Sequence, residues 1–214
     1  GGLSESFEER LYQFSVQAVE FYNLGVAHFK AKDWDPAIKA FSRALELEAG
    51  QDFGGDVRAY LMATYKEKGL VKEMLGQAML LYKARPAGKE SRDLVVAHLE
   101  ADKNWKALAE AAAQWTVWQP EDPDNWRFLA LGQKNSGQET EAARSLLKVA
   151  ELEPAKASGW LMAAEALDKT GDSEAAKRAY QKVVELEPDN EKAESALLRM
   201  ALESLPNSGK SGGR

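Results

Sequence analysis

The chain contains no cysteine, which excludes disulfides, thiolate metal sites and cysteine nucleophiles together. It has only two histidines, His28 and His98, and the sequence places no carboxylate or serine around either of them. This gives no support to a catalytic triad or a histidine metal site. No run of about 18 apolar residues occurs, so we expect no membrane span. The formal net charge of −6 lacks the basic excess that nucleic-acid binding normally needs.

These absences predict a protein without metal or cofactor, and we do not expect an enzyme. Hydrophobic residues make up 44% of the chain and charged residues 29%, as in soluble globular proteins. Ala, Leu, Glu and Lys are abundant while Val and Ile are sparse, which favours helices. A missing cysteine fits the cytoplasm and the periplasm alike, so the compartment stays open. The start at Gly1-Gly2 without Met fits a natural, a processed or an introduced terminus equally.

Four prolines recur at a fixed interval in the chain. Pro86, Pro120, Pro154 and Pro188 lie 34 residues apart, and Ala49 stands in the corresponding place 37 residues before Pro86. A constant interval of this length indicates a repeat architecture. The interval divides the chain into five repeat units, with residues 52–54 inserted between the first two. The units are 18–51, 55–88, 89–122, 123–156 and 157–190.

Each repeat unit has helical apolar spacing with a break near its middle. In the first unit Lys32-Asp33 turns the chain, and Asp35-Pro36 is expected to supply the cap and opening turn of the second helix. In three other units the break carries a glycine, which accepts the left-handed conformation that ends a helix. These glycines are Gly69, Gly137 and Gly171. The proline that closes a unit prevents the second helix from continuing, so each unit is predicted to be a helix–turn–helix.

With these motifs the units resemble tetratricopeptide repeats over residues 18–190. The resemblance implies an all-α fold, a right-handed α-α superhelical solenoid of five repeats. The second and third units are divergent, with Met62 and Val96 where the family has small residues, and we expect both to fold with altered helix spacing. The matching residues are Phe21, Leu24, Gly25, Ala37, Phe41 and Ala44 in the first unit, Trp126, Leu129, Ala130, Gly137, Ala142 and Pro154 in the fourth, and Trp160, Ala163, Ala164, Gly171, Ala176, Tyr180 and Pro188 in the fifth.

Helices are also predicted at both ends of the repeat array. Residues 1–17 carry an apolar stripe that includes Phe7, Leu11 and Phe14 and is predicted to continue into the first repeat helix. This helix either covers the open end of the solenoid or pairs with a second chain. Residues 191–205 have the character of a capping helix, which a solenoid needs over its last repeat. Residues 206–214 are rich in Gly and Ser and are predicted to be a disordered tail.

The resemblance also implies a concave groove lined by the first helices of successive repeats, where a partner would bind. The groove would have an apolar and aromatic floor with acidic residues near its middle. It lacks the Lys/Asn/Arg cluster with which some family members hold a chaperone's C-terminal carboxylate. The groove residues predicted to bind the partner are Tyr22, Asn23, Val26, Phe29, Tyr60, Asp93, Leu94, Arg127, Phe128, Leu131, Leu161 and Met162.

The sequence therefore predicts a scaffold or adaptor that binds a peptide or helix of another protein. We expect that partner to carry apolar anchors and some basic residues. The alternative from the sequence is a structural protein that self-assembles into homo-oligomers through its N-terminal helix or its solenoid ends. A further alternative for the groove is that its side chains pack on neighbouring helices and leave no space for a ligand.

Overall fold

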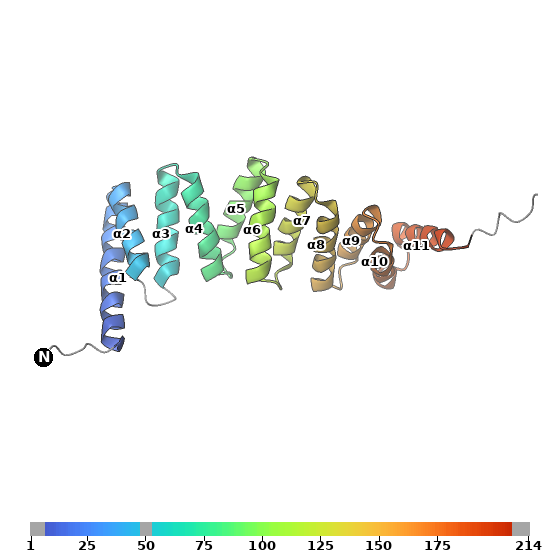
Figure 1. Ribbon diagram of the computed structural model, residues 1–214, viewed down its shortest axis with the longest axis horizontal. Coiled ribbons are helices and arrows are strands. Elements are labelled where there is room, and N and C mark those ends of the chain that lie inside the picture. Colours follow the sequence, from blue (N-terminus) through green and yellow to red (C-terminus); the bar gives the residue numbers. More distant parts are fainter. Residues whose placement is uncertain (1–6, 48–52, 207–214) are drawn as a thin grey trace, which may run out of the picture. The chain divides into compact units, whose positions relative to one another are not determined.

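The computed structural model describes residues 7–47 and 53–206, and all regular structure in these ranges is α-helical (Figure 1). The chain forms two compact units, Gly1–His98 and Leu99–Arg214, with the boundary inside the fifth helix. The eleven helices of the described ranges are α1 (Phe7–Lys30), α2 (Trp34–Leu47), α3 (Phe53–Glu67), α4 (Val71–Ala84), α5 (Glu90–Ala101), α6 (Trp105–Trp118), α7 (Pro123–Asn135), α8 (Glu139–Leu152), α9 (Ala157–Lys169), α10 (Ser173–Leu186) and α11 (Glu191–Glu203).

Helices that follow one another in the chain pack against one another within each unit. In the first unit α1 packs on α2, α2 on α3 and α3 on α4. In the second unit the same succession joins α6 to α7 and continues through to α11. Within each unit these helices are therefore paired with their neighbours in sequence, and the predicted all-α fold of antiparallel helix pairs is confirmed.

The core of the first unit forms around one aromatic ring. Phe41 on α2 is completely buried and packs with Ala37, Ala44, Val57 and Leu61. Gly25 on α1 makes this possible, because a Cβ there would lie 2.5 Å from Cδ1 of Phe41. The side chains of Phe7, Leu11 and Phe14 lie outside the described part of α1, as does the predicted tail from residue 207. Helix α1 itself runs unbroken from Phe7 to Lys30.

The start of α2 differs from the sequence prediction by two residues. The helix begins at Trp34, so Asp33 precedes it and Asp35 lies in its first turn. Pro36 is still accommodated there, because the amides of a first turn have no acceptor within the helix. An acidic residue in that turn also faces the positive end of the helix dipole. The cap position that the sequence assigned to Asp35 was therefore wrong, although a helix does start at this point.

The turns inside the repeats share one left-handed backbone position. Gly69, Gly137 and Gly171 occupy it with φ of 70°, 80° and 86°. Lys32 and Lys103 occupy it in the other two units with φ of 60° and 52°. The same turn therefore forms with or without glycine, and a lysine there adopts a conformation that costs it conformational energy.

Two tryptophans tie their helices to the preceding turn at the same interval as the prolines. The indole Nε1 of Trp126 donates to the carbonyl of Pro120 at 2.8 Å. The indole Nε1 of Trp160 donates to the carbonyl of Pro154 at 3.0 Å. Trp115, on the helix before Trp126, is completely buried. The two indole hydrogen bonds therefore join α7 and α9 to the turns that precede them.

Helix α11 covers the end of the second unit's core. Ala193 is completely buried, and Ala196, Leu197 and Met200 pack against the cluster formed by α9 and α10. Asn190 caps the helix, its Oδ1 accepting from the backbone amide of Ala193 at 3.1 Å. The opposite face of α11 carries apolar side chains that point to solvent. Leu198 and Leu202 are 63% and 60% exposed, and Leu205, just beyond the end of the helix, is 63% exposed.

In the divergent units, bulky side chains occupy the core side of the second helix. Met74 and Ala78 on α4 are buried, and Tyr82 one turn further is completely buried. Leu108 and Ala112 on α6 are also completely buried, as is Trp115. Of the two departures named from the sequence, Val96 is buried and Met62 is half-buried. Within residues 7–47 and 53–206, no helix has the length and apolar character needed to cross a membrane.

Candidate peptide-binding groove

The predicted groove residues of the first unit are aromatic rings that pack on one another. Tyr22 on α1 lies edge-on to Phe53 at 5.1 Å and to Tyr60 at 5.8 Å between ring centroids. Tyr60 also stacks on Phe41 at 5.3 Å and meets Phe29 at 5.3 Å. All these rings except Phe41 keep part of their surface exposed. They form a semi-exposed floor whose inner side belongs to the core.

The polar surroundings of this floor are largely matched within the chain. Burial raises the pKa of Tyr22, and the nearby Tyr60 and Asp56 raise it further. Asp56 in turn accepts a hydrogen bond from Nη1 of Arg85 at 2.9 Å. Of the remaining predicted residues on α1, Asn23 is exposed and Val26 is half-buried.

Asp93 and Leu94 lie on α5, where a buried arginine holds the aspartate. Arg92 is only 2% exposed, and its Nη2 donates to Oδ1 of Asp93 at 2.9 Å. The guanidinium carbon of Arg92 lies 5.5 Å from the centroid of the Tyr82 ring. Leu94 is half-buried. The acidic residues that the sequence predicts near the middle of the groove therefore include at least two, Asp56 and Asp93, that already pair with arginines of the chain.

In the second unit four of the predicted residues come together around an open space. Arg127, Phe128 and Leu131 on α7 and Met162 on α9 line a cleft of about 540 Å³, which we call the α7–α9 cleft. The Phe128 ring rests on the buried Trp115 at 6.2 Å between centroids. Met162 is 57% exposed. The predicted anchors of this unit thus face a space that the chain does not fill.

The floor of the α7–α9 cleft comes from α8, which the sequence prediction did not include. Leu146 and Val149 line the cleft from below, and Gly159 leaves room on the α9 side. The prediction considered only the first helix of each repeat. The helical spacing of Leu146 and Val149 marks both as inward-facing residues, but it does not show that the space above Leu146 is open.

Charged side chains line the cleft, and Arg127 and Lys156 both pair with the same carboxylate, that of Glu153. Glu153 accepts from Nζ of Lys156 at 2.8 Å and pairs with the Arg127 guanidinium. Arg127 also donates to Oδ1 of Asp124 at 2.7 Å. The hydrogen bond from Lys156 and the charge of Arg127 hold the pKa of Glu153 below its usual range, against the opposing effect of burial. Lys134 completes the charged residues of the lining.

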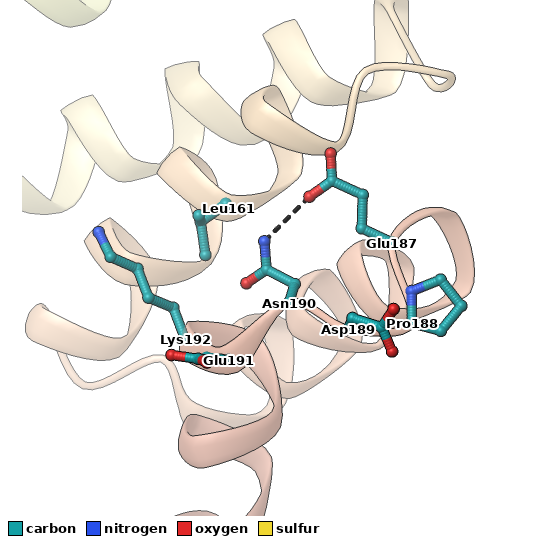
Figure 2. A pocket seen from close by; sticks show the side chains of 7 residues that line it. All are labelled: Leu161, Glu187, Pro188, Asp189, Asn190, Glu191 and Lys192. Carbon is teal, nitrogen blue, oxygen red and sulfur yellow. Dashed lines mark hydrogen bonds between the residues drawn. The ribbon is translucent and has the colours of Figure 1, made fainter.

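Leu161, the last predicted residue, lines a different pocket between α9 and the turn into α11 (Figure 2). This α9–α11 pocket measures about 670 Å³. It lies one repeat beyond the α7–α9 cleft, because Leu161, Glu187 and Asn190 stand 34 residues after Arg127, Glu153 and Lys156. In Figure 2 Asn190 points to Glu187, and its Nδ2 donates to Glu187 Oε2 at 3.0 Å. The other lining residues are Pro188, Asp189, Glu191 and Lys192.

Neither histidine lines the α7–α9 cleft or the α9–α11 pocket. His28 Nδ1 is 3.9 Å from Oδ2 of Asp33, which corrects the expectation that no carboxylate lies near it, although this distance is too long for a hydrogen bond. His98 is half-buried on α5. In the part of the chain that the structure describes, no group of three His, Asp or Glu side chains is arranged to hold a metal ion.

Two segments of the sequence match a known family. Residues 18–49 and residues 157–190 each match the tetratricopeptide repeat. The first segment contains α2 and most of the repeat part of α1, and the second contains α9 and α10. The sequence has no match among curated proteins.

Solved structures of helical repeat proteins resemble the chain at low sequence identity. MamA from Desulfovibrio magneticus RS-1 is 16% identical, with a TM-score of 0.42 over 82% of this chain and 97% of that one. YrrB, described as a TPR protein with an unusual peptide-binding site, is 17% identical, with a TM-score of 0.43 over 90% of this chain and 97% of that one.

Proposed function

We propose that the chain is an interaction module, a scaffold or adaptor that binds a segment of a partner protein and catalyses no reaction, since two of its segments match the tetratricopeptide repeat. The observation that carries this proposal is the α7–α9 cleft. Its apolar side chains Phe128, Leu131 and Met162 are half-buried or exposed, and they surround a space wide enough for side chains of a ligand. Apolar anchors in an open concavity are typical of sites that bind peptides.

The first unit has a separate surface that also suits a protein ligand. Its aromatic floor on α1 and α3 keeps part of each ring exposed, Asp56 lies on α3 itself, and Asp93 lies on α5. A ligand with large apolar side chains and some Lys or Arg would suit this surface. Because Arg85 and Arg92 already pair with these aspartates, the basic residues of the ligand would have to compete with them.

The experiment that tests the function uses a library of random peptides displayed on phage. The full chain is the target, and Met162→Glu is the matched variant with a blocked cleft. Met162 suits this purpose because its exposure allows the substitution without loss of core packing. Tyr60 would be a poor choice, because it stacks on Phe41 and its replacement would disturb the core.

We expect the wild-type chain to select peptides with large apolar residues, and Met162→Glu to lose a distinct set of them. Circular dichroism should show the same helix content in both proteins. If no peptide is selected, or if Met162→Glu selects the same sequences as the wild type, the cleft does not bind a partner.

Self-association is favoured by one specific observation, the exposed leucines of α11. Leu198 and Leu202 lie one turn apart on one face of the helix and are each at least 60% exposed. Light scattering over a range of concentrations measures it directly. A mass that rises with concentration in the wild type, and stays at that of one chain in Leu198→Ser/Leu202→Ser, would establish assembly through this face. A constant single-chain mass in both would exclude it.

A further inference from the structure

The α7–α9 cleft differs from the rest of this acidic protein in the sign of its charge. The whole chain has a formal net charge of −6. The cleft lining contains three cations, Arg127, Lys134 and Lys156, and a single carboxylate, Glu153. The lining is therefore positive in a chain whose overall composition is acidic.

All but one of these cations have partners within the chain. Arg127 pairs with Asp124 and Glu153, and Lys156 pairs with Glu153. Lys134, in the last turn of α7, makes no ion pair with any residue between 7–47 or 53–206. It also borders a smaller hollow beside the cleft, where the other cation, Lys169, pairs with Glu139 at 2.9 Å. Lys134 is thus the one lining cation of the two spaces that forms no ion pair within the described residues, since the second carboxylate of the hollow, Glu165, lies 3.5 Å from Lys192.

The corresponding pocket one repeat later has the opposite charge. The α9–α11 pocket contains three carboxylates, Glu187, Asp189 and Glu191, and one cation (Figure 2). That cation, Lys192, lies 3.5 Å from Glu165. The repeated backbone therefore does not impose a positive lining, and the charge at the α7–α9 cleft belongs to this repeat alone.

We propose that the α7–α9 cleft binds a protein segment in which a large apolar side chain is followed or preceded closely by an Asp or Glu. The apolar side chain rests on Phe128, Leu131 and Met162, and the carboxylate pairs with Lys134. This deepens the proposed function and rests on it. Charge complementarity at such a site selects the partner and speeds association more than it adds affinity, so the acidic residue determines which segments the cleft accepts.

The test starts from a peptide that the wild-type chain selects and Met162→Glu loses. Three versions are synthesised, with Glu, Gln or Lys at each acidic position, and fluorescence anisotropy measures their dissociation constants with the full chain. The variant is Lys134→Glu. The matched control is Lys177→Glu, which makes the same charge change at an exposed position of α10 outside both spaces.

We expect the wild type to bind the Glu version about tenfold more tightly than the Lys version, because attraction to Lys134 is replaced by repulsion. Lys134→Glu should reverse this order, and Lys177→Glu should preserve it. The preference should weaken as salt is raised, since an exposed pair is screened. If the selected peptides contain no acidic residue, or if the order survives Lys134→Glu, or if Lys177→Glu abolishes it equally, the charge assignment is wrong. The proposed function would fail separately, by the absence of any peptide that depends on Met162.

Discussion

At the scale of single residues, the turns inside the repeats adopt the same left-handed backbone conformation with two different residue types. Three of them use glycine, while Lys32 and Lys103 adopt a positive φ. Sequence reasoning identified the three glycine turns and assigned only a generic turn to Lys32-Asp33. The reason is physical: a lysine can adopt this conformation at a modest energetic cost, so its presence gives no local signal.

Replacing a lysine that has a positive φ by glycine should stabilise the protein. Lys103→Gly is expected to raise the free energy of unfolding by about 1 kcal/mol, because glycine adopts the left-handed region without strain. Gly137→Ala should lower it by about the same amount. A Cβ at Gly137 would meet nothing within 4 Å, so that effect would come from the backbone alone. Urea unfolding followed by circular dichroism measures both, and a stabilising Gly137→Ala would contradict this account.

The Glu153 carboxylate should make the protein sensitive to acid. Its folded-state pKa is lowered by Lys156 and Arg127, so the stability that it contributes is present above its unfolded pKa, about 4.3. That stability is lost as the pH falls through the lower, folded value. Glu153→Gln should therefore flatten the fall in stability below about pH 4.3. Unfolding midpoints between neutral and acidic pH measure this, with the exposed Glu141→Gln as control, and equal slopes in both variants would refute the assignment.

At the scale of helices, the sequence predicted most of what the structure contains. Proline intervals and apolar spacing located the helix pairs, and the amphipathic pattern of residues 191–205 predicted which face of α11 packs. What the pattern could not supply is the distance between helices. Tyr22 and Tyr60 were assigned to a ligand, but α1 and α3 are close enough for the two rings to meet. Leu146, in contrast, was overlooked as a lining residue, because spacing alone does not indicate an open space above a helix.

The two faces of α11 should respond differently to the same substitution. Leu197→Ser/Met200→Ser removes apolar surface that covers the core, and we expect a loss of about 2 to 3 kcal/mol for two half-buried side chains. Leu198→Ser/Leu202→Ser changes only exposed side chains and should leave stability within about 0.5 kcal/mol. Thermal unfolding of both double variants measures the contrast. Equal losses would mean that α11 does not cover the core with the face described.

At the scale of the whole molecule, the helices other than α5 pack mainly on their neighbours in sequence within each unit, so a disturbance should stay local. Gly132 allows a test, because a Cβ there would lie 2.6 Å from the backbone nitrogen of Ala109 on α6. Gly132→Ala should cost about 1 to 3 kcal/mol through overpacking. Hydrogen exchange should become faster in α6, α7 and α8 and stay unchanged in α1 and α2.

The matched substitution for that experiment is Gly76→Ala on α4. A Cβ at Gly76 meets nothing within 4 Å, so alanine should stabilise the helix by about 0.5 to 1 kcal/mol. Faster exchange in α1 and α2 of Gly132→Ala would show that the chain unfolds as one cooperative block. That result would contradict the expectation that a helix is stabilised mainly by the helices next to it in the sequence.

Arg127 and Leu161 occupy the same position in successive repeats. This has a consequence for how a repeat protein acquires new binding preferences. When a segment of 34 residues is duplicated, the copy inherits the helices, the turn and the proline, but each surface position can then mutate without disturbing the original. Here a lining with more cations and a lining with more carboxylates occur 34 residues apart on the same helical scaffold. Evolution of a new preference would therefore need only a few changes at the lining, with the stacking of the array left intact.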